Sequence, residues 1–389
     1  MDTKTVVMRR THFMFVLACA AQLVAPHARA QSGPSAAAIA DYQAKLAQYQ
    51  AARAPYEAQA TAYWDAIADK RRARNAKRRD HVPIELDDYV LTQPPVYSGP
   101  PRPIDPRAPL APPPERPEIP VVADFLHNAA EQFGFVPDRP ANELDFKRAY
   151  ARAALADGLT REQIVGVYAF ETGGNGAYDS QAGLVPYRAG ARAISPAIGY
   201  NQLLSTNTVS LLAEHGGRFA GVLRQKANAL TGSAKLAMER KLEAFKRMIA
   251  FSRSVPARWS EQDRLAKTTA GGYGIHAAVL DIDIGPLLQV QKLINSVHFA
   301  RAKGYTTPLT AAELELMNLT GDGNGFDMVT MPQALRVRVP TANFFQQQGY
   351  ERNPVARRTG VVANLISDIE MKMGQGAQSQ GAREMASAF

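Results

Sequence analysis

Hydrophobic positions from residue 121 onward recur mostly at helical spacing. Apolar residues stand three and four positions apart, and runs that alternate like strands are few. We therefore predict a mainly α fold for a domain over 121–373. The segments expected to be helical are 121–135, 141–156, 160–170, 206–214, 219–252, 286–303, 310–319 and 361–373. The following 374–389 are small and polar, which predicts a flexible tail.

The clearest helix start is at Thr160. Its hydroxyl can accept from the backbone amide of Gln163, and the side chain of Gln163 can reach back, which is a capping box. The apolar stretch that follows delivers Glu171, and the glycine-rich 172–176 stop the helix.

The segment before this domain has two parts of different amino-acid composition. Residues 35–79 are rich in Ala, Gln, Lys and Arg with apolar positions at helical intervals, and Pro55 interrupts them. This predicts two amphipathic helices or one kinked helix, a coiled-coil-like arm over 31–80. In 94–120, 12 of 27 residues are proline, so 81–120 is predicted to be a semi-rigid, extended, proline-rich linker.

The first thirty residues have the layout of a cleaved secretory signal. A basic start ending Arg9-Arg10 precedes an apolar stretch over 13–25 and a small-residue site at 28–30. A membrane anchor is the alternative, but about 20 apolar residues are needed to cross a bilayer. No later segment has 18 uninterrupted apolar residues. We expect a protein exported to the periplasm or cell envelope, with no transmembrane segment after cleavage.

Composition and charge exclude several classes. Hydrophobic residues make up 46% of the chain and charged residues 21%, the balance of a globular protein. The net charge of +9 is spread thinly, with 29 basic and 24 acidic residues in 121–389, so no nucleic-acid partner is expected. The dense basic run 70–79 is read as a solvated helix end, with contact to anionic lipid or wall polymer as the alternative.

Other chemical motifs are weak. Cys19 is the only cysteine, which excludes a disulfide framework and a multi-cysteine zinc site. The run 322–327 begins like a calcium loop, but no glutamate follows at the required position, so a turn is expected. The glycines of 272–277 imitate a dinucleotide fingerprint without a preceding strand. We expect no metal, no cofactor and no serine nucleophile.

Glu171 is the leading candidate for chemistry. Burial beside the apolar helix raises the pKa of its carboxyl, and the negative end of the helix dipole does the same. A carboxylic acid that stays protonated near neutral pH can protonate the leaving oxygen of a glycoside. The alternative is a surface glutamate near a helix end.

Three segments together resemble the soluble lytic transglycosylase and goose-type lysozyme family. The family has Glu-Ser after an apolar helix, then Gly-Leu-Met-Gln, then Ala-Tyr-Asn-x-Gly. This chain has Glu171-Thr172, then Gly199-Tyr200-Asn201-Gln202, then Met317-Asn318-Leu319-Thr320-Gly321. The resemblance covers 121–350 and implies a lysozyme-like helical catalytic domain, with an insertion near 205–285.

The resemblance also implies the roles of several residues. Glu171 would be catalytic, and Gln202 and Asn318 would face the glutamate and the sugar. Tyr350 is the best-placed candidate for stabilising developing positive charge. The remaining candidate substrate contacts are Gly199, Tyr200, Asn201, Tyr178 and Gln181.

The implied activity is cleavage of the MurNAc–GlcNAc bond of peptidoglycan with one glutamate as acid and base, giving a 1,6-anhydro product. Asp179 offers a hydrolytic alternative if it holds a water, although a turn residue is the preferred interpretation. Because Thr172, Tyr200, Asn201 and Met317 depart from the family letters, a non-catalytic wall-binding or scaffold protein is the second alternative. Expected partners are peptidoglycan strands and, through the arm, cell-envelope proteins.

Overall fold

The computed structural model describes residues 34–108, 118–184 and 191–389. The chain divides into two compact units, one comprising Met1–Ala52 with Gly99–Pro113 and the other Arg53–Ser98 with Pro114–Phe389. The predicted signal segment, including Cys19, lies outside the described residues, as does 109–117 of the predicted linker.

The arm is one helix, α1 (Ala36–Arg79), which continues through Pro55. Of the two arrangements expected from the sequence, two helices or one kinked helix, the structure has a single helix. In the first unit, the guanidinium of Arg107 lies 6.0 Å from the ring centre of Tyr42 on α1. The division between the units falls inside this helix and not at its end.

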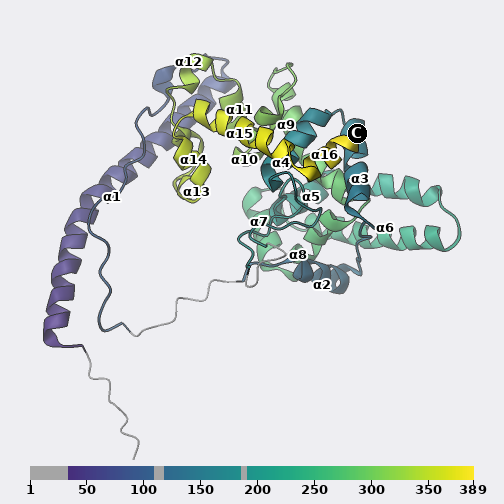
Figure 1. Ribbon diagram of the computed structural model, residues 1–389, viewed down its shortest axis with the longest axis horizontal. Coiled ribbons are helices and arrows are strands. Elements are labelled where there is room, and N and C mark those ends of the chain that lie inside the picture. The colour runs from purple at the N-terminus through teal and green to yellow at the C-terminus, as the bar shows by residue number, and fades with distance from the viewer. Residues whose placement is uncertain (1–33, 109–117, 185–190) are drawn as a thin grey trace, which may run out of the picture. The chain divides into compact units, whose positions relative to one another are not determined.

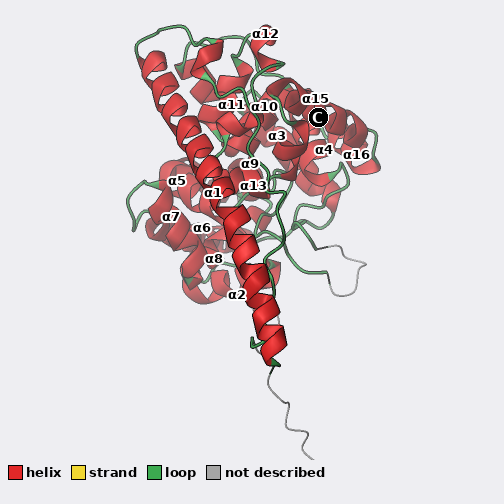
Figure 2. Ribbon diagram, turned by 90° about the vertical axis from the view of Figure 1, so that its left-hand side faces the viewer, coloured by secondary structure: helices red, strands yellow, loops and turns green. Residues whose placement is uncertain are grey.

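The second unit is built almost entirely of helices (Figures 1 and 2). The described residues contain isolated β-bridges, such as Gln181 with Ile198, but no strand. The mainly α class is therefore confirmed. The helices after α1 are η1 (Leu86–Asp88), α2 (Val122–Phe133), α3 (Glu143–Ala156), α4 (Arg161–Thr172), α5 (Ser205–Asn228), α6 (Gly232–Ser252), α7 (Trp259–Thr268), α8 (Ala270–His276), η2 (Ala277–Leu280), α9 (Gly285–Ala302), α10 (Ala311–Thr320), α11 (Asp322–Val329), α12 (Gln333–Arg336), η3 (Thr341–Phe344), α13 (Gln347–Arg352), α14 (Pro354–Thr359), α15 (Val362–Ala377) and α16 (Gln380–Ser387).

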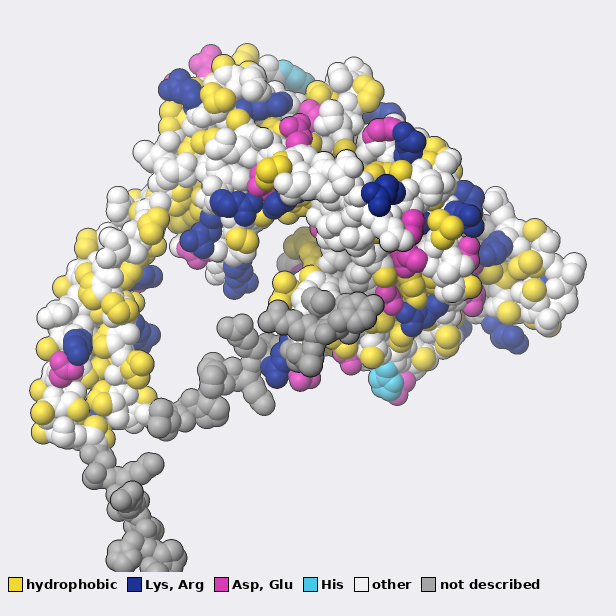
Figure 3. All heavy atoms as spheres, in the orientation of Figure 1, with side chains coloured by type: hydrophobic (Ala, Val, Ile, Leu, Met, Phe, Trp, Pro, Cys, Tyr) yellow, Lys and Arg dark blue, Asp and Glu magenta, His cyan; other side chains and the backbone are white. Residues whose placement is uncertain are grey.

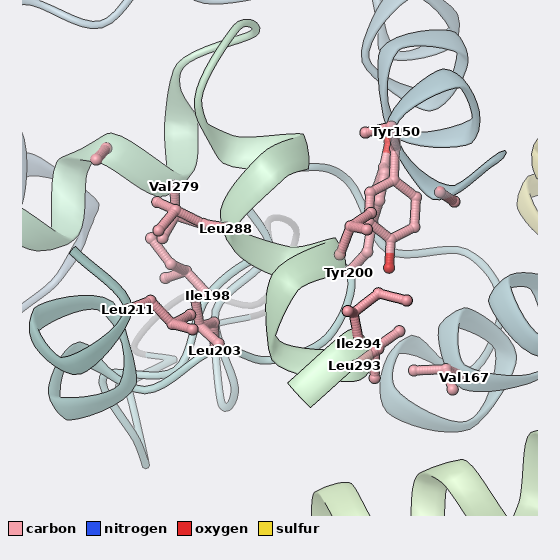
Figure 4. Packing of buried hydrophobic residues seen from close by; sticks show 14 of the residues in the cluster. Tyr150, Val167, Ile198, Tyr200, Leu203, Leu211, Val279, Leu288, Leu293 and Ile294 are labelled. Carbon is pink, nitrogen blue, oxygen red and sulfur yellow. The ribbon is translucent and has the colours of Figure 1, made fainter. Parts of the chain in front are cut away.

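The main core forms where α4, α9 and α10 meet α3 and α15. Tyr150 and Tyr200 pack edge to face with ring centres 5.4 Å apart, and Leu293 and Val167 belong to the same cluster (Figure 4). All four side chains are fully buried. Such burial stabilises the fold by roughly 1.5–3 kcal/mol for each large apolar side chain, so this core holds α3, α4 and α9 together.

Two helix predictions were wrong around α5 and α6, which pair as a hairpin (Figure 1). The expected break at 215–218 lies inside α5, and the expected single helix 219–252 is interrupted between Asn228 and Gly232. Gly216 lies inside α5 and does not end it. It allows α6 to pack closely against α5, because a Cβ on this residue would lie 2.6 Å from Cγ1 of Ile249. A packed glycine thus resembled a breaker in the sequence.

The predicted flexible tail is folded. The helix α15 continues to Ala377, and α16 buries Ala382 and Met385 completely. The ammonium of Lys147, itself buried, donates to the carboxylate of Glu384 at 2.9 Å. Small residues that looked unstructured instead allow this segment to pack closely against α3 and α4.

The basic run at the end of α1 is not simply solvated. Arg74 is fully buried, donates to the carbonyl oxygens of Asp88 and Asn343, and lies 4.5 Å from the ring centre of Tyr89. Arg78 forms an ion pair with Asp327. The prediction of a solvated end therefore holds only for its exposed members, because the run packs against the helical domain of the same unit.

The first part of the predicted linker also packs against that domain. Tyr89 is buried, and its ring centre lies 6.0 Å from that of Phe344. The backbone of Val90 exchanges two hydrogen bonds with the side chain of Asn343, at 2.9 and 2.8 Å. The residues just after α1 are thus not a free spacer.

The structure places two weak sequence motifs in helices. The calcium-like run 322–327 begins α11 and is not a turn. The glycines of 272–277 lie in α8, where a Cβ on Gly272 would come within 2.0 Å of the carbonyl of Leu265. These glycines allow close packing of the helix, and they do not form a phosphate-binding turn. No helix within the described ranges combines the length and apolar character needed to cross a membrane.

Candidate active site

The candidate site begins with the last turn of α4, which presents Glu171. The predicted capping box is present, since Thr160 Oγ1 accepts from the amide of Gln163 at 3.2 Å and Gln163 Oε1 accepts from the amide of Thr160 at 2.9 Å. The helix ends at Gly173, whose φ of 62° is left-handed. Glu171 is partly exposed, so a group from outside can reach it.

The second element is α10, which places Glu315 and Asn318 against Glu171. Asn318 Nδ2 donates to Glu171 Oε1 at 2.9 Å. Glu315 is fully buried, and neither of its carboxyl oxygens accepts from a donor among the described residues. The groups that act on its pKa are the Glu171 carboxyl, the Asn318 amide and the Lys292 ammonium. Two acidic side chains thus meet in one small polar cluster.

Both carboxyl groups hold their protons more tightly than usual. Burial raises the pKa of Glu171 to about 7, against the opposing effects of Glu315, Lys292 and Asn318. Burial and the neighbouring Glu171 carboxylate raise the pKa of Glu315 well above its ordinary value. Two adjacent carboxyls cannot both ionise in such a site, so near neutral pH Glu315 keeps its proton and donates it in a hydrogen bond to Glu171.

This arrangement can carry general acid and base chemistry. A carboxyl whose pKa is about 7 is present in both protonation states near neutral pH. Glu171, which is partly exposed, can exchange a proton with a bound molecule, whereas Glu315, which is fully buried, cannot.

The sequence interpretation missed Glu315 and Lys292. A signal was available, because Glu315 stands within the apolar run Leu314 to Met317 and three positions before Asn318. Positions three apart lie on one face of a helix. A carboxylate in the apolar part of a helix is therefore a candidate partner for a second buried acid.

The motif around Gly199 lies mostly in the core. Tyr200 is fully buried and its hydroxyl donates to the carboxylate of Glu143. Asn201 is 2% exposed, accepts from Tyr150 at 2.6 Å and donates to the carbonyl of Gln289 at 2.9 Å. Gly199 is also buried, and a Cβ there would lie 2.8 Å from the Gln289 side chain. These three residues hold the turn in place and present no surface to a sugar.

Gln202 is partly exposed, but its amide serves its own turn. Its backbone φ is 43°, and Nε2 donates to the carbonyl oxygens of Ser180 and Gly199 at 3.0 and 2.9 Å. Gln181 is buried and donates to Pro120 and Ser195 carbonyls. Neither glutamine directs its amide nitrogen toward Glu171 in the structure.

Tyr178 and Asp179 share one partner, Arg139. The Arg139 guanidinium donates to the Tyr178 hydroxyl at 2.6 Å and to the Asp179 carboxylate at 2.5 Å. Asp179 lies in a turn, which agrees with the preferred interpretation from the sequence, and its ion pair ties that turn to Arg139.

Tyr350 lies in a second hydrophobic cluster with Tyr63, Ile67, Ala342 and Ala356. Its ring centre is 5.7 Å from that of Trp64 on α1. Its helix α13 is well separated from α4 in Figure 1. The structure therefore groups Tyr350 with α1 and not with the carboxyl pair.

The glycines after Glu171 are approached by the chain itself. A Cβ on Gly174 would lie 2.1 Å from the carbonyl oxygen of Gly376, and Ser379 Oγ donates to the carbonyl of Gly174 at 2.6 Å. The hydroxyl of Thr172 donates to the Tyr168 carbonyl at 2.6 Å. The segment that approaches these glycines closely is thus the end of α15 and the turn that follows it.

Comparison with known proteins gives no assignment: no family profile, curated protein or solved structure matches the chain.

Proposed function

We propose that this protein is a peptidoglycan lytic transglycosylase, with Glu171 as acid and base at the MurNAc–GlcNAc bond. The observation that carries the proposal is the partly exposed Glu171 with its pKa near 7, hydrogen-bonded to Asn318 and beside buried Glu315. The proposal also depends on the motif resemblance, in which Asn318 meets Glu171 as expected while the Gln202 amide serves its own turn.

The proposed reaction needs one carboxyl that changes protonation state. Protonated Glu171 donates to the leaving glycosidic oxygen while the substrate's 2-acetamido oxygen attacks the anomeric carbon. Glu171, now a carboxylate, removes the proton of the 6-hydroxyl, whose oxygen closes the 1,6-anhydro ring and releases the acetamido group. The proton returns to Glu171, so no water is consumed.

Glu315 acts in this scheme through Glu171. Its protonated carboxyl donates to the Glu171 carboxylate and stabilises the base form, as Asn318 does. Without these two donors, burial would hold Glu171 in its acid form and the second step would be slower. The opposing effects of burial and hydrogen bonding on the pKa thus keep both the protonated and the ionised form of Glu171 accessible.

The substrate of this reaction is in the cell wall, and 1–30 carry the pattern of an export signal. The net charge of +9 suits an anionic wall polymer. We propose that the mature protein works in the periplasm or cell envelope.

The test is mass spectrometry of fragments released from purified sacculi by the mature protein and by Glu171→Gln. The matched control is Glu370→Gln, an equal change at an exposed glutamate on α15. Fragments lighter by one water, released by the protein and the control but not by Glu171→Gln, are expected.

The alternatives give different results in the same experiment. Hydrated fragments would indicate a hydrolytic muramidase. Equal sedimentation of the protein and Glu171→Gln with sacculi, without release from either, would favour a non-catalytic wall-binding protein. The burial of Tyr200 and Asn201 is the observation that favours this second candidate, because it removes two expected sugar contacts.

A further inference from the structure

A cavity of about 890 Å³ lies between the end of α1, the end of α9 and the start of α11, all in the second unit. It is distinct from the Glu171 cluster. Its size is that of pockets that hold small organic ligands. The charged residues in its lining are Arg71, Arg78, Arg79, Lys303, Asp322 and Asp327.

The net charge of this lining is +2, from four cationic side chains and two carboxylates. Both carboxylates already have partners, since Asp327 pairs with Arg78 and Asp322 accepts from the hydroxyl of Ser296 at 2.6 Å. Arg79 and Lys303 have no carboxylate partner in the described part of the chain. Figure 3 shows several Lys and Arg side chains near this end of α1, with Asp and Glu side chains among them.

Arg71 adds a guanidinium of fixed position to the cavity wall. Its Nη2 donates to backbone carbonyls of Asn343 and Phe345, at 3.3 and 2.6 Å, which fixes the guanidinium. Its Nε is buried and has no acceptor among the described residues. The Arg71 guanidinium thus lines the cavity in a fixed position and contributes its positive charge there.

The start of α11 supplies further donors. Gly321, Gly323 and Asn324 line the cavity, and no side chain caps this helix. The first backbone amides of a helix lack partners within the helix, and its dipole favours an anion there. A Cβ on Gly323 would meet nothing within 4 Å, so the backbone is open on that side.

We propose that this cavity binds a phosphate group through Arg71, Arg79, Lys303 and the first amides of α11. A phosphate monoester carries a charge of roughly −1.5 to −2 at neutral pH, which matches the net charge of the lining, whereas a carboxylate carries only one charge. Phe299 and Phe326, with ring centres 5.8 Å apart, form an apolar wall for the rest of the ligand. Such a phosphate is that of a soluble metabolite or of a lipid headgroup.

The test is calorimetric titration of the mature protein with inorganic phosphate and with pyrophosphate. We expect binding that weakens about tenfold in Arg79→Gln and in Lys303→Gln, each of which loses one charge-assisted contact. The matched control is Arg72→Gln, because Arg72 lies on the same helix, is exposed, and pairs with Asp69 outside the cavity. Retained binding in both cavity variants, or no binding by the protein, would overturn the proposal.

Two further arms identify the source and the chemistry. Sedimentation with phosphatidylglycerol vesicles that is lost in Arg79→Gln and kept in Arg72→Gln would support a lipid headgroup, whereas binding of free phosphate without vesicle binding would support a soluble ligand. Succinate that binds as tightly as phosphate would contradict the phosphate assignment. Glu171→Gln should bind phosphate normally, so this result is separate from the outcome at the active site.

Discussion

Asn318 Nδ2 donates to Glu171 Oε1 at 2.9 Å, joining α10 to the end of α4 across 147 positions of the chain. This hydrogen bond favours the charged form of Glu171, while burial favours the neutral form. The balance keeps the pKa of Glu171 at about 7. A mechanism that uses Glu171 first as acid and then as base depends on that balance.

The first prediction concerns the pH dependence of glycan cleavage. Glu171 must carry a proton to donate it, and with a pKa of about 7 it loses that proton as the pH rises above 7. We expect the initial rate of muropeptide release to fall about tenfold for each pH unit well above this pKa. A rate that stays constant to pH 9 would contradict the role of Glu171 as acid.

The second prediction is that Asn318→Leu raises the pKa of Glu171. The hydrogen bond from the Asn318 amide stabilises the carboxylate, and a bond to a charged group contributes roughly 1.5–3 kcal/mol. Since one pKa unit is about 1.4 kcal/mol, we expect a rise of about one to two units. Carbon-13 NMR titration of the glutamate carboxyls, with Glu171→Gln to assign the signal, measures this shift. An unchanged titration would show that Asn318 does not stabilise the charged form.

The third prediction concerns stability and Glu315. The pKa of this buried carboxyl is raised in the folded protein, so its neutral form is favoured there. The stability linked to Glu315 is therefore full below about pH 4.5 and is lost as the pH rises toward its folded pKa, by about 1.4 kcal/mol per unit. Glu315→Gln, which cannot ionise, should unfold at a higher temperature than the unchanged protein at pH 8.

Thermal unfolding at pH 4 and pH 8 checks this prediction. The two proteins should differ little at pH 4, and Glu370→Gln, at an exposed position, should show no gain at either pH. A gain for Glu315→Gln that is the same at both pH values would indicate better packing and not the removal of a titrating group.

The fourth prediction compares adjacent glycines at the end of α4. Gly174 has a φ of 75°, and a Cβ there would lie 2.1 Å from the Gly376 carbonyl oxygen, so Gly174→Ala should destabilise the protein by about 3 kcal/mol. Gly173 has a similar φ of 62° with nothing within 4 Å, so Gly173→Ala should cost about 1 kcal/mol.

Urea unfolding of both glycine variants separates the two effects. Equal losses would show that backbone conformation alone matters and that the contact with the turn after α15 contributes nothing. A larger loss for Gly174→Ala would show that the C-terminal helices are held against the site.

Local patterns in the sequence were sufficient for part of this protein. Helical spacing of apolar residues predicted a mainly α domain, and the capping box at Thr160 is formed as expected. That box and the apolar turns after it place Glu171 at the end of its helix, because both signals act within a few residues.

Only the tertiary structure decided which residues share the site. Glu315 and Lys292 approach Glu171 from α10 and α9, while Tyr200 and Asn201 turn into the core. A motif letter does not state whether its side chain faces solvent or a neighbouring helix, since that depends on packing between distant segments. The same reason explains the folded tail, which looked flexible because its residues are small and polar. A Cβ on Gly174 or Gly381 would lie within 3 Å of a backbone oxygen of the other segment, so their missing side chains let the two backbones meet.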